Sequence, residues 1–298
     1  ALITGALAPD GGESLVLKAI RKAHRRGSLV AGSSAGAAIM SEVMISGGTS
    51  LEAATYGVVD DPDQPGMLLE PGLGFFPWGM VDQHFSKRGR FGRLVVGMLA
   101  SGATRGFGID ENTALIVEGR TAQVIGEFGA VVLHLEEAKV DHGRRLIENI
   151  GFSYADNGDS CDLDTGEVLP GPGKRPVKRR DITYKAPARS LRNVFGAYTL
   201  YDLMARLVLG DPEAYPADRA RAIEPKAGCA TSVEISRQGG RAAAYIPGGG
   251  RDFRMTAVDF RASMQTRQLN AAQLAENRHA ALSRDYGLKP GTQARVML

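Results

Sequence analysis

The stretch Gly32-Ser33-Ser34-Ala35-Gly36 decides the fold of this chain. A short apolar run, residues 28–31, leads into it, and residues 37–43 follow with helical character. A strand that breaks into a helix at a Gly-x-Ser-x-Gly pentapeptide forms a nucleophile elbow, in which a strained turn exposes the central serine. The pattern therefore predicts an α/β protein with Ser34 as a nucleophile. For the pentapeptide alone, a turn of small residues without any chemistry is the alternative.

Two further expectations follow from the nucleophile elbow, one for its glycines and one for its backbone N–H groups. Both glycines should be required, because a side chain at either position would collide with the neighbouring strand and helix. The backbone N–H groups at the start of the helix, with that of Ala35 first, would face a developing oxyanion.

A serine nucleophile needs a base that takes its proton and a carboxylate that fixes the tautomer of that base. Further along, the chain supplies His84 and then Glu111, each in a short segment rich in glycine and polar residues. Asp82 and Asp110 lie next to these segments and are also available. Because successive side chains of a strand alternate between its faces, only one of Asp110 and Glu111 should reach His84, and we expect Glu111.

Three blocks of the sequence resemble the signature blocks of the cyanophycinases, in the serine peptidase family that also contains dipeptidase E. The blocks are residues 33–37, residues 82–86 with the following Arg88-Gly89-Arg90, and residues 108–114. The resemblance covers about residues 1–135 and implies a triad of Ser34 as nucleophile, His84 as base and Glu111 as the orienting acid. It also implies a flavodoxin-like or glutamine-amidotransferase-like sheet with helices on both faces, and a homodimer. The implied substrate is cyanophycin, a poly-aspartate with arginine on each β-carboxyl, which is cut to β-Asp-Arg dipeptides.

Polar and cationic side chains around His84 are the candidates for substrate binding. They are Asp82, Gln83, Arg88, Arg90 and Arg93. Guanidinium groups bind carboxylates bidentately. We expect Arg88 to hold a substrate carboxylate, because it is nearest to His84 and to the start of a helix predicted over residues 86–101. Gln83 is expected to hydrogen-bond the isopeptide or the substrate backbone, and surface ion pairs are the alternative role for the arginines.

The arginine side chains of such a substrate need acidic partners. The sequence offers Asp60, Asp61, Asp63 and Glu70 without deciding among them. They lie in residues 44–80, a long stretch punctuated by glycine and proline that we expect to line the substrate cleft as a loop.

The surrounding sequence predicts an incomplete α/β core followed by an added region. Only 33 residues precede Ser34, too few for the first strands and for the Gly-Gly-Asp-Gln-type loop of the family. We therefore expect the N-terminal strands to be absent from this chain, or to be supplied by a separate N-terminal chain. The predicted catalytic core is residues 1–135, with a helix over 13–26, a strand over 28–31 and four short strands between 105 and 135. Residues 136–298 are a predicted C-terminal α+β extension of undefined role.

Composition narrows the function classes only a little. The chain is 43% hydrophobic and 23% charged, with a net charge of +3. Much of the positive charge lies in residues 174–180, after Pro170-Gly171-Pro172-Gly173, where we predict a solvated linker rather than a nucleic-acid patch. No apolar run approaches the roughly 18 residues of a membrane span. We expect a peptide or polymer substrate, with neither nucleic acid nor membrane as a partner, in the cytoplasm or outside the cell.

The sequence gives no metal or cofactor signature. The spacing of Cys161 and Cys229 fits no zinc pattern, and the aspartates at 60–63 and 162–164 lack the remaining ligands of a calcium loop. One disulfide or two unrelated thiols are both compatible with the two cysteines.

Three function classes remain on sequence grounds. The first is a serine peptidase of the cyanophycinase type, with an aspartyl or isoaspartyl dipeptidase of the dipeptidase E type as its variant. The second is an α/β-hydrolase esterase, in which the acid comes between serine and histidine and would be Asp60, Asp61 or Asp63. The third is a binding or scaffold protein without catalysis.

Overall fold

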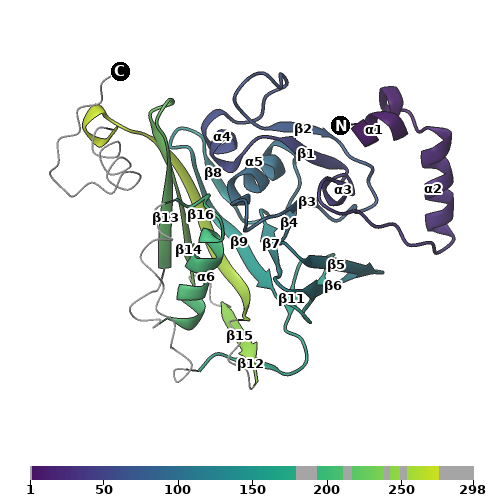
Figure 1. Cartoon of the computed structure of the whole chain (residues 1–298). Coiled ribbons are helices and arrows are strands. Elements are labelled where there is room, and N and C mark those ends of the chain that lie inside the picture. The colour runs from purple at the N-terminus through teal and green to yellow at the C-terminus, as the bar shows by residue number, and fades with distance from the viewer. Residues whose placement is uncertain (1, 179–192, 211–216, 238–241, 249–253, 275–298) are drawn as a thin grey trace.

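The computed structural model shows a mixed α/β protein, as the sequence predicts (Figure 1). It describes residues 2–178, 193–210, 217–237, 242–248 and 254–274. The helices are α1 Leu2–Leu7, the 3-10 turn η1 Pro9–Gly11, α2 Leu15–Arg25, α3 Ala35–Ala38, α4 Ser50–Tyr56, α5 Phe91–Ser101 and α6 Thr199–Leu209. The strands are β1 Val43–Gly47, β2 Leu68–Pro71, β3 Met80–Gln83, β4 Arg105–Ile109, β5 Thr113–Glu118, β6 Thr121–Gly126, β7 Ala130–His134, β8 Lys139–Asp141, β9 Leu146–Ala155, β10 Ser160–Asp162, β11 Val168–Leu169, β12 Lys174–Pro176, β13 Ala217–Glu224, β14 Cys229–Ser236, β15 Ala243–Pro247 and β16 Thr256–Gln268.

One large sheet organises the molecule. Its main path runs β12-β15-β16-β9-β7-β4-β3, and β13, β14 and β8 are attached beside that path. Strands β3 and β4 pair in parallel and are connected through α5. From β4 onward the neighbouring strands of the path pair antiparallel. A parallel pair needs such a crossover connection, and the helix of that crossover covers one face of the sheet.

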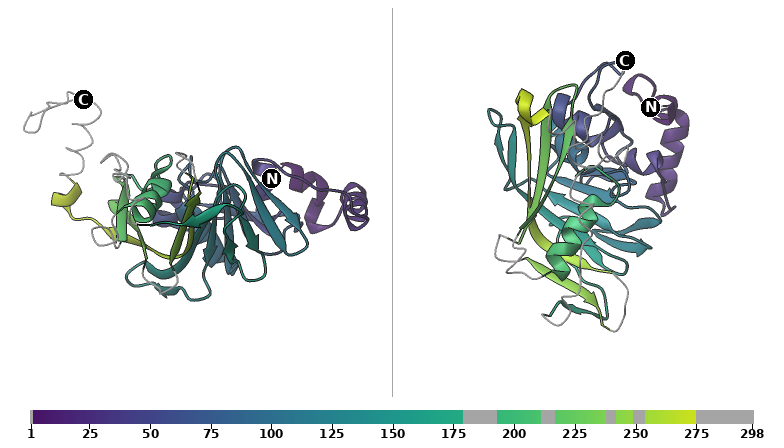
Figure 2. Two further views of the ribbon diagram at one scale, coloured as in Figure 1. Left: turned by 90° about the horizontal axis from the view of Figure 1, so that it is seen from below. Right: turned by 60° about the vertical axis from the view of Figure 1, so that its left-hand side comes forward.

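The two faces of the sheet have different covers. Val131 and Leu133 of β7 belong to a core that includes residues of α4, α5 and α6. Val132, between them, belongs to a second core with residues of β6, β10 and the loop before β3. Because strand side chains alternate between faces, α4, α5 and α6 lie on one side, and a four-stranded sheet of order β11-β10-β6-β5 lies on the other. Figure 2 shows α6, the green helix, against one face of the sheet. The finer expectation of a flavodoxin-like sheet with helices on both faces stays a prediction.

The second half of the chain extends the sheet that the first half begins. Strand β9 pairs with β7, and β16 pairs with β9. The predicted division into residues 1–135 and 136–298 stays a prediction, but strands from both ranges share one sheet. Within the predicted linker over residues 174–180, Lys174–Pro176 form β12, and residues 179 and 180 lie outside the described residues. The buried Lys174 ammonium donates to Asp159 at 2.5 Å and to Thr256 at 2.9 Å, which pins β12 to β16.

Some local expectations are wrong, each for a physical reason. Residues 28–31 are coil, since no described strand pairs with them. Residues 44–80 are not one loop but include β1, α4 and β2. The helix predicted over 86–101 begins only at Phe91, because the chain after His84 first makes a tight turn.

The N-terminal helices pack loosely against the rest of the molecule (Figure 1). The helix predicted over residues 13–26 forms as α2, but it buries only Leu17 among its side chains. Leu15 is 84% exposed, and Leu29, in the coil that leads to the elbow, is 87% exposed.

Two further observations concern membranes and thiols. None of the helices in the described residues is long and apolar enough to cross a membrane. Cys161 and Cys229 are both buried, and both are free thiols.

Candidate active site

Ser34 has the strained backbone of a nucleophile elbow. Its φ is 52° and its ψ is −123°, and it immediately precedes α3. Positive φ is uncommon for a residue other than glycine and costs of the order of 1–3 kcal/mol, so it persists only where the surroundings enforce it. The side chain of Ser34 is exposed. Ala35 is the first residue of α3, so its N–H has no acceptor within the helix and is available to an oxyanion.

The two elbow glycines differ in importance. A Cβ on Gly32 would lie 2.0 Å from the carbonyl oxygen of Gly36 and 2.6 Å from Met40 Cε. A Cβ on Gly36 would meet nothing within 4 Å outside its own helix. The expectation that both glycines are required is therefore confirmed for Gly32 and wrong for Gly36, whose Cβ direction is open.

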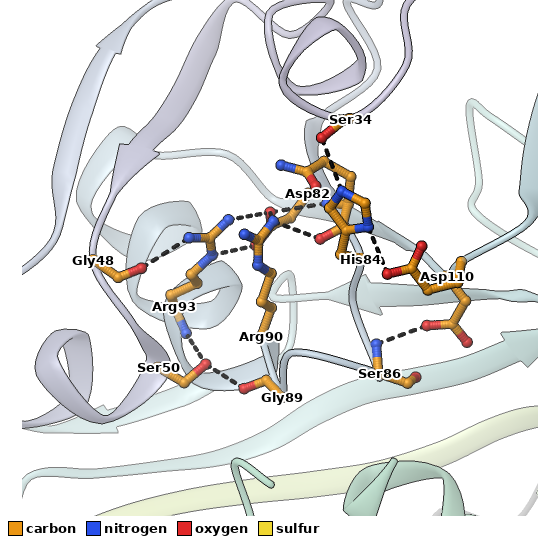
Figure 3. Close-up of polar contacts among 12 residues, drawn as sticks. Ser34, Gly48, Ser50, Asp82, His84, Ser86, Gly89, Arg90, Arg93 and Asp110 are labelled. Carbon is orange, nitrogen blue, oxygen red and sulfur yellow. Dashed lines mark hydrogen bonds and ion pairs between the residues drawn. The ribbon is translucent and has the colours of Figure 1, made fainter. Parts of the chain in front are cut away.

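His84 and Glu111 meet because they follow adjacent parallel strands. Gln83, the last residue of β3, lies opposite Ile109, the last residue of β4. The carboxyl ends of parallel strands lie at the same edge of a sheet, where ligand sites of α/β proteins form. His84 Nδ1 is 2.7 Å from Glu111 Oε1, and His84 Nε2 is 2.8 Å from Ser34 Oγ (Figure 3).

The carboxylate of Glu111 fixes the proton arrangement of this chain of contacts. A carboxylate only accepts hydrogen bonds, so Nδ1 of His84 carries the proton and Nε2 is free to accept from the Ser34 hydroxyl. Partial burial raises the pKa of Glu111, but the hydrogen bond and charge of His84 and the charge of Lys87 outweigh it and leave that pKa below its ordinary value. Glu111 is therefore ionised at neutral pH.

Asp110 faces away from the imidazole and holds the histidine turn. Its Oδ1 accepts the Ser86 N–H at 2.7 Å (Figure 3). Its Oδ2 accepts the Tyr154 hydroxyl at 3.3 Å. The structure thus places Glu111 rather than Asp110 on His84, as the strand alternation predicts. Burial raises the pKa of Asp110 to about 6 against these hydrogen bonds.

Asp82, Arg90 and Arg93 form a buried ion cluster behind His84. Asp82 is fully buried, and its carboxylate accepts from Arg93 Nε at 2.7 Å, Arg93 Nη2 at 2.5 Å and Arg90 Nη1 at 3.1 Å (Figure 3). Arg90 also donates to the Gln83 carbonyl at 2.6 Å. Burial lowers the pKa of Arg90 to about 10 although Asp82 opposes the shift, so Arg90 stays cationic at neutral pH.

The ion cluster corrects part of the predicted binding site. Buried groups that already pair with one another are unavailable for direct substrate contact, so Asp82, Arg90 and Arg93 support the segment that carries His84. Arg93 also donates to the Gly48 carbonyl, and its N–H donates to Ser50 Oγ, which bonds the Gly89 carbonyl. The sequence carried no signal for the contributions of Gly48 and Ser50.

The side chains of Gln83 and Arg88 do not pair with the carboxylate of the ion cluster, and their predicted substrate contacts stay predictions. Arg88 is exposed, and it makes no hydrogen bond or ion pair with a side chain in the described part of the chain. Gln83 is half-buried, and its Oε1 has no hydrogen-bond partner among the described residues. Both residues are within four positions of His84.

The acidic residues of the predicted cleft stretch do not join the triad. Asp61 caps its own turn by accepting the Asp63 N–H at 2.9 Å, and Asp60 is exposed. Glu70 lies on β2, opposite Met44 of β1. The described residues contain no cluster of three or more His, Cys, Asp or Glu side chains that could hold a metal ion.

The parallel β3-α5-β4 unit and the Ser34–His84–Glu111 contacts define an α/β protein with a site of the serine hydrolase type. Residues 12–125 match the model of Peptidase family S51. The chain is also similar to the cyanophycinase of Trichormus variabilis, with 35% identity over 164 residues that cover 52% of each chain. The cyanophycinase of Synechococcus elongatus is 35% identical over 149 residues, 47% of this chain and 44% of that one. For the cyanophycinase of Geminocystis herdmanii the identity is 31% over 165 residues, 52% and 58% of the two chains.

These findings confirm the resemblance that the three motifs indicate. The segment that carries Ser34, His84 and Glu111 matches the model of Peptidase family S51 and is similar to the cyanophycinases. The chain spans about half the length of the curated relatives it matches.

The difference between the two elbow glycines can be tested by a matched pair of substitutions. Gly32→Ala forces the backbone at Gly36 to move, and a displacement of about 1 Å at a catalytic group costs about a hundredfold in rate. We expect Gly32→Ala to lose about that factor in the rate of labelling of Ser34 by a fluorophosphonate. Gly36→Ala should label at the wild-type rate, and equal losses in both variants would contradict the elbow geometry.

The pKa of Asp110 predicts a pH-dependent stability. In the unfolded chain the carboxyl titrates near 3.8, and in the folded protein near 6. Stabilisation by the bound proton is complete below pH 3.8 and is lost as the pH rises through 6. At about 1.4 kcal/mol per pKa unit, the loss is about 3 kcal/mol. Asp110→Asn keeps an oxygen for the Ser86 N–H but cannot ionise.

We therefore expect the unfolding free energy of Asp110→Asn, relative to wild type, to rise by about 2.4 kcal/mol between pH 4 and pH 7. Urea denaturation at a series of pH values measures this difference. Asp60→Asn, at an exposed position, is the control and should show a flat difference. A flat difference for Asp110→Asn would show that Asp110 ionises normally in the fold.

Proposed function

We propose that this protein is a serine-type peptidase of the cyanophycinase kind that hydrolyses cyanophycin to β-Asp-Arg dipeptides. The relay from Ser34 through His84 to Glu111 supports the proposal most directly, because it unites the three residue types of a peptidase triad at hydrogen-bonding distances. The names of the similar curated proteins support the substrate.

The first half of the proposed reaction forms an acyl-enzyme. Ser34 Oγ attacks the scissile carbonyl carbon while His84 Nε2 takes the hydroxyl proton. Glu111, ionised and bonded to Nδ1, stabilises the imidazolium that forms. The Ala35 N–H donates to the carbonyl oxygen as it becomes negative. When the tetrahedral intermediate collapses, the C–N bond breaks and the leaving amine receives the proton from His84.

The second half releases the product. A water molecule gives a proton to His84 Nε2 and attacks the ester carbonyl, and the same donors stabilise the second oxyanion. His84 then returns the proton to Ser34 Oγ as the ester bond breaks. The charges balance at each step because the proton moves between Ser34, His84 and the substrate, while Glu111 stays ionised.

The substrate groups are proposed to meet the residues that remain available in the site. Arg88, exposed and unpaired among the described side chains, binds a carboxylate of the aspartate backbone. The free Gln83 Oε1 accepts an N–H of the isopeptide or backbone. A homodimer, a flavodoxin-like sheet and a contribution of the N-terminal strands from elsewhere are implied by the family resemblance and are proposals of the same kind.

The competing assignments differ in observable ways. The esterase assignment needs Asp60, Asp61 or Asp63 as the orienting acid, whereas the His84 ring contacts Glu111. A non-catalytic scaffold has no need for a strained Ser34 backbone or for the hydrogen bond between Ser34 and the His84 imidazole. A dipeptidase of the dipeptidase E type shares the triad, and only the substrate separates it from a cyanophycinase.

The assay uses the full gene product that contains these 298 residues. It offers cyanophycin, an α-linked aspartyl dipeptide and a simple ester in parallel, with products identified by mass spectrometry. We expect release of β-Asp-Arg, and Ser34→Ala should reduce it about a thousandfold or more, as triad deletions do. Ser33→Ala, the matched control, should stay near wild type. Cleavage of only the α-linked dipeptide would favour dipeptidase E, and cleavage of only the ester would overturn the proposal.

The role of Arg88 gives a separate prediction. Arg88→Ala should lower kcat/KM for cyanophycin about tenfold or more, because a bidentate charge-assisted contact is lost. Arg88→Lys keeps the positive charge but lacks the two parallel N–H donors of the guanidinium, so its decrease in kcat/KM should be intermediate. Arg144→Ala removes a guanidinium at another exposed position and should leave kcat/KM unchanged. A wild-type value for Arg88→Ala would remove Arg88 from the site.

A further inference from the structure

The second half of the chain reaches the turn that carries His84. Before α6, the chain runs along this turn, and the Tyr198 N–H donates to the Ser86 carbonyl at 2.7 Å. A Cβ on Gly89 would lie 2.1 Å from the Phe195 carbonyl oxygen, so the two segments are in direct backbone contact. Residues beyond 135 therefore form part of the surroundings of the base.

Tyr198 stacks on an aromatic residue from beside the orienting acid. The rings of Tyr198 and Phe128 are 5.5 Å apart at 26°. Phe128 lies between Glu127, whose N–H donates to the Asn112 carbonyl at 3.0 Å, and Gly129, whose carbonyl accepts the Asp110 N–H at 3.1 Å. The neighbours of Phe128 in the sequence therefore hydrogen-bond to Asp110 and Asn112, the two residues that flank Glu111.

A closed chain of contacts connects the aromatic stack to the segments that carry His84 and Glu111. Tyr198 bonds Ser86, and Ser86 bonds Asp110. Asp110 in turn bonds Gly129, next to Phe128, which stacks on Tyr198. The half-buried aromatic side chains of Phe128 and Tyr198 are therefore each connected, through the backbone, to a segment that carries a member of the triad.

The backbone of Tyr198 is strained. Its φ is 59° and its ψ is 10°, in the left-handed region. This conformation is a genuine outlier for a bulky residue, and such strain is typical of residues held for function. The bond to Ser86 and the bond from the Asp202 N–H to the Tyr198 carbonyl at 3.0 Å hold it.

A carboxylate without a cation lies next to the stack. Glu127 is exposed, and its Oε2 accepts from Asn112 Nδ2 at 2.9 Å. No cationic side chain in the described part of the chain pairs with it. Asn112 follows Glu111 directly, so this acid and the triad share one short segment.

We propose that Glu127, Phe128 and Tyr198 form the subsite for the guanidinium group of a substrate arginine. A planar guanidinium stacks on aromatic faces and binds a carboxylate through two parallel N–H donors. Arg88 on the histidine side would hold the aspartate carboxylate, and Glu127 on the other side would hold the arginine. The inference rests on the proposed function, since it assigns the arginine-binding part of that site.

The test compares two substrates that differ only in charge. One is a trimer of the β-Asp-Arg unit, and the other is the same trimer with citrulline, which has the shape of arginine without its charge. For Glu127→Gln we expect kcat/KM to fall about tenfold with the arginine trimer, because a charge-assisted contact is lost. With the citrulline trimer the same variant should change less than about twofold. Glu118→Gln, at an exposed position in the β5–β6 hairpin, is the control and should not change either value.

The aromatic pair is tested in the same way. Tyr198→Phe keeps the ring and should stay near wild type with both trimers. Tyr198→Leu removes the ring and should lose about tenfold with the arginine trimer only. Circular dichroism checks that each variant folds, and Phe128→Leu replaces Tyr198→Leu if the latter does not. An equal loss with both trimers would mean a purely structural role and would overturn the proposal, as would no loss.

Binding separates failure of the subsite from failure of the proposed function. Calorimetric titration of the arginine trimer into Ser34→Ala protein needs no turnover. A further Glu127→Gln substitution should weaken this binding about tenfold. If wild-type protein releases no β-Asp-Arg, the proposed function fails. If Glu127→Gln leaves the affinity unchanged, the subsite fails whether or not cleavage occurs.

Discussion

The parallel pairing of β3 with β4 is the constraint on which the site depends. It brings the ends of two strands that are far apart in sequence to one edge, where His84 and Glu111 lie 2.7 Å apart. Only a crossover can connect parallel neighbours, and α5 provides it. Arg90, directly before α5, and Arg93, in its first turn, both form ion pairs with Asp82 on β3. The same short unit therefore builds the catalytic edge and its buried support.

The strained residues are enforced by the packing around them. Ser34, His84, Asn112 and Tyr198 all have positive φ, and each lies in or beside the site. Their left-handed backbones persist because neighbouring contacts over-determine them. For the elbow, the contact is the close approach of Gly32 to the Gly36 carbonyl. For the histidine turn, it is the pair of bonds that Ser86 makes through its N–H and its carbonyl.

The sequence predicted the triad contacts well because the motif residues lie at element ends, where glycine and polar residues mark them. It predicted β4, β5, β6 and β7 closely, because short apolar runs between turns favour strands. The strand predicted over residues 28–31 does not form. A strand needs a hydrogen-bonded neighbour, and the β-propensity of its own residues does not provide one. The sequence assigned Arg90 and Arg93 to the substrate because their charges were visible but their burial against Asp82 was not.

The ion cluster has a consequence for how the protein meets a charged ligand. Asp82 carries one negative charge and faces two guanidinium groups, so the buried support retains one uncompensated positive charge. It lies in surroundings of low polarisability, where water and dissolved ions screen it poorly. Its field adds to those of Lys87 and Arg88, which follow His84 in the sequence, and makes the electrostatic potential at this edge of the sheet more positive. The cluster that holds the histidine turn in place therefore also favours the approach of an anionic ligand over that of a cationic one.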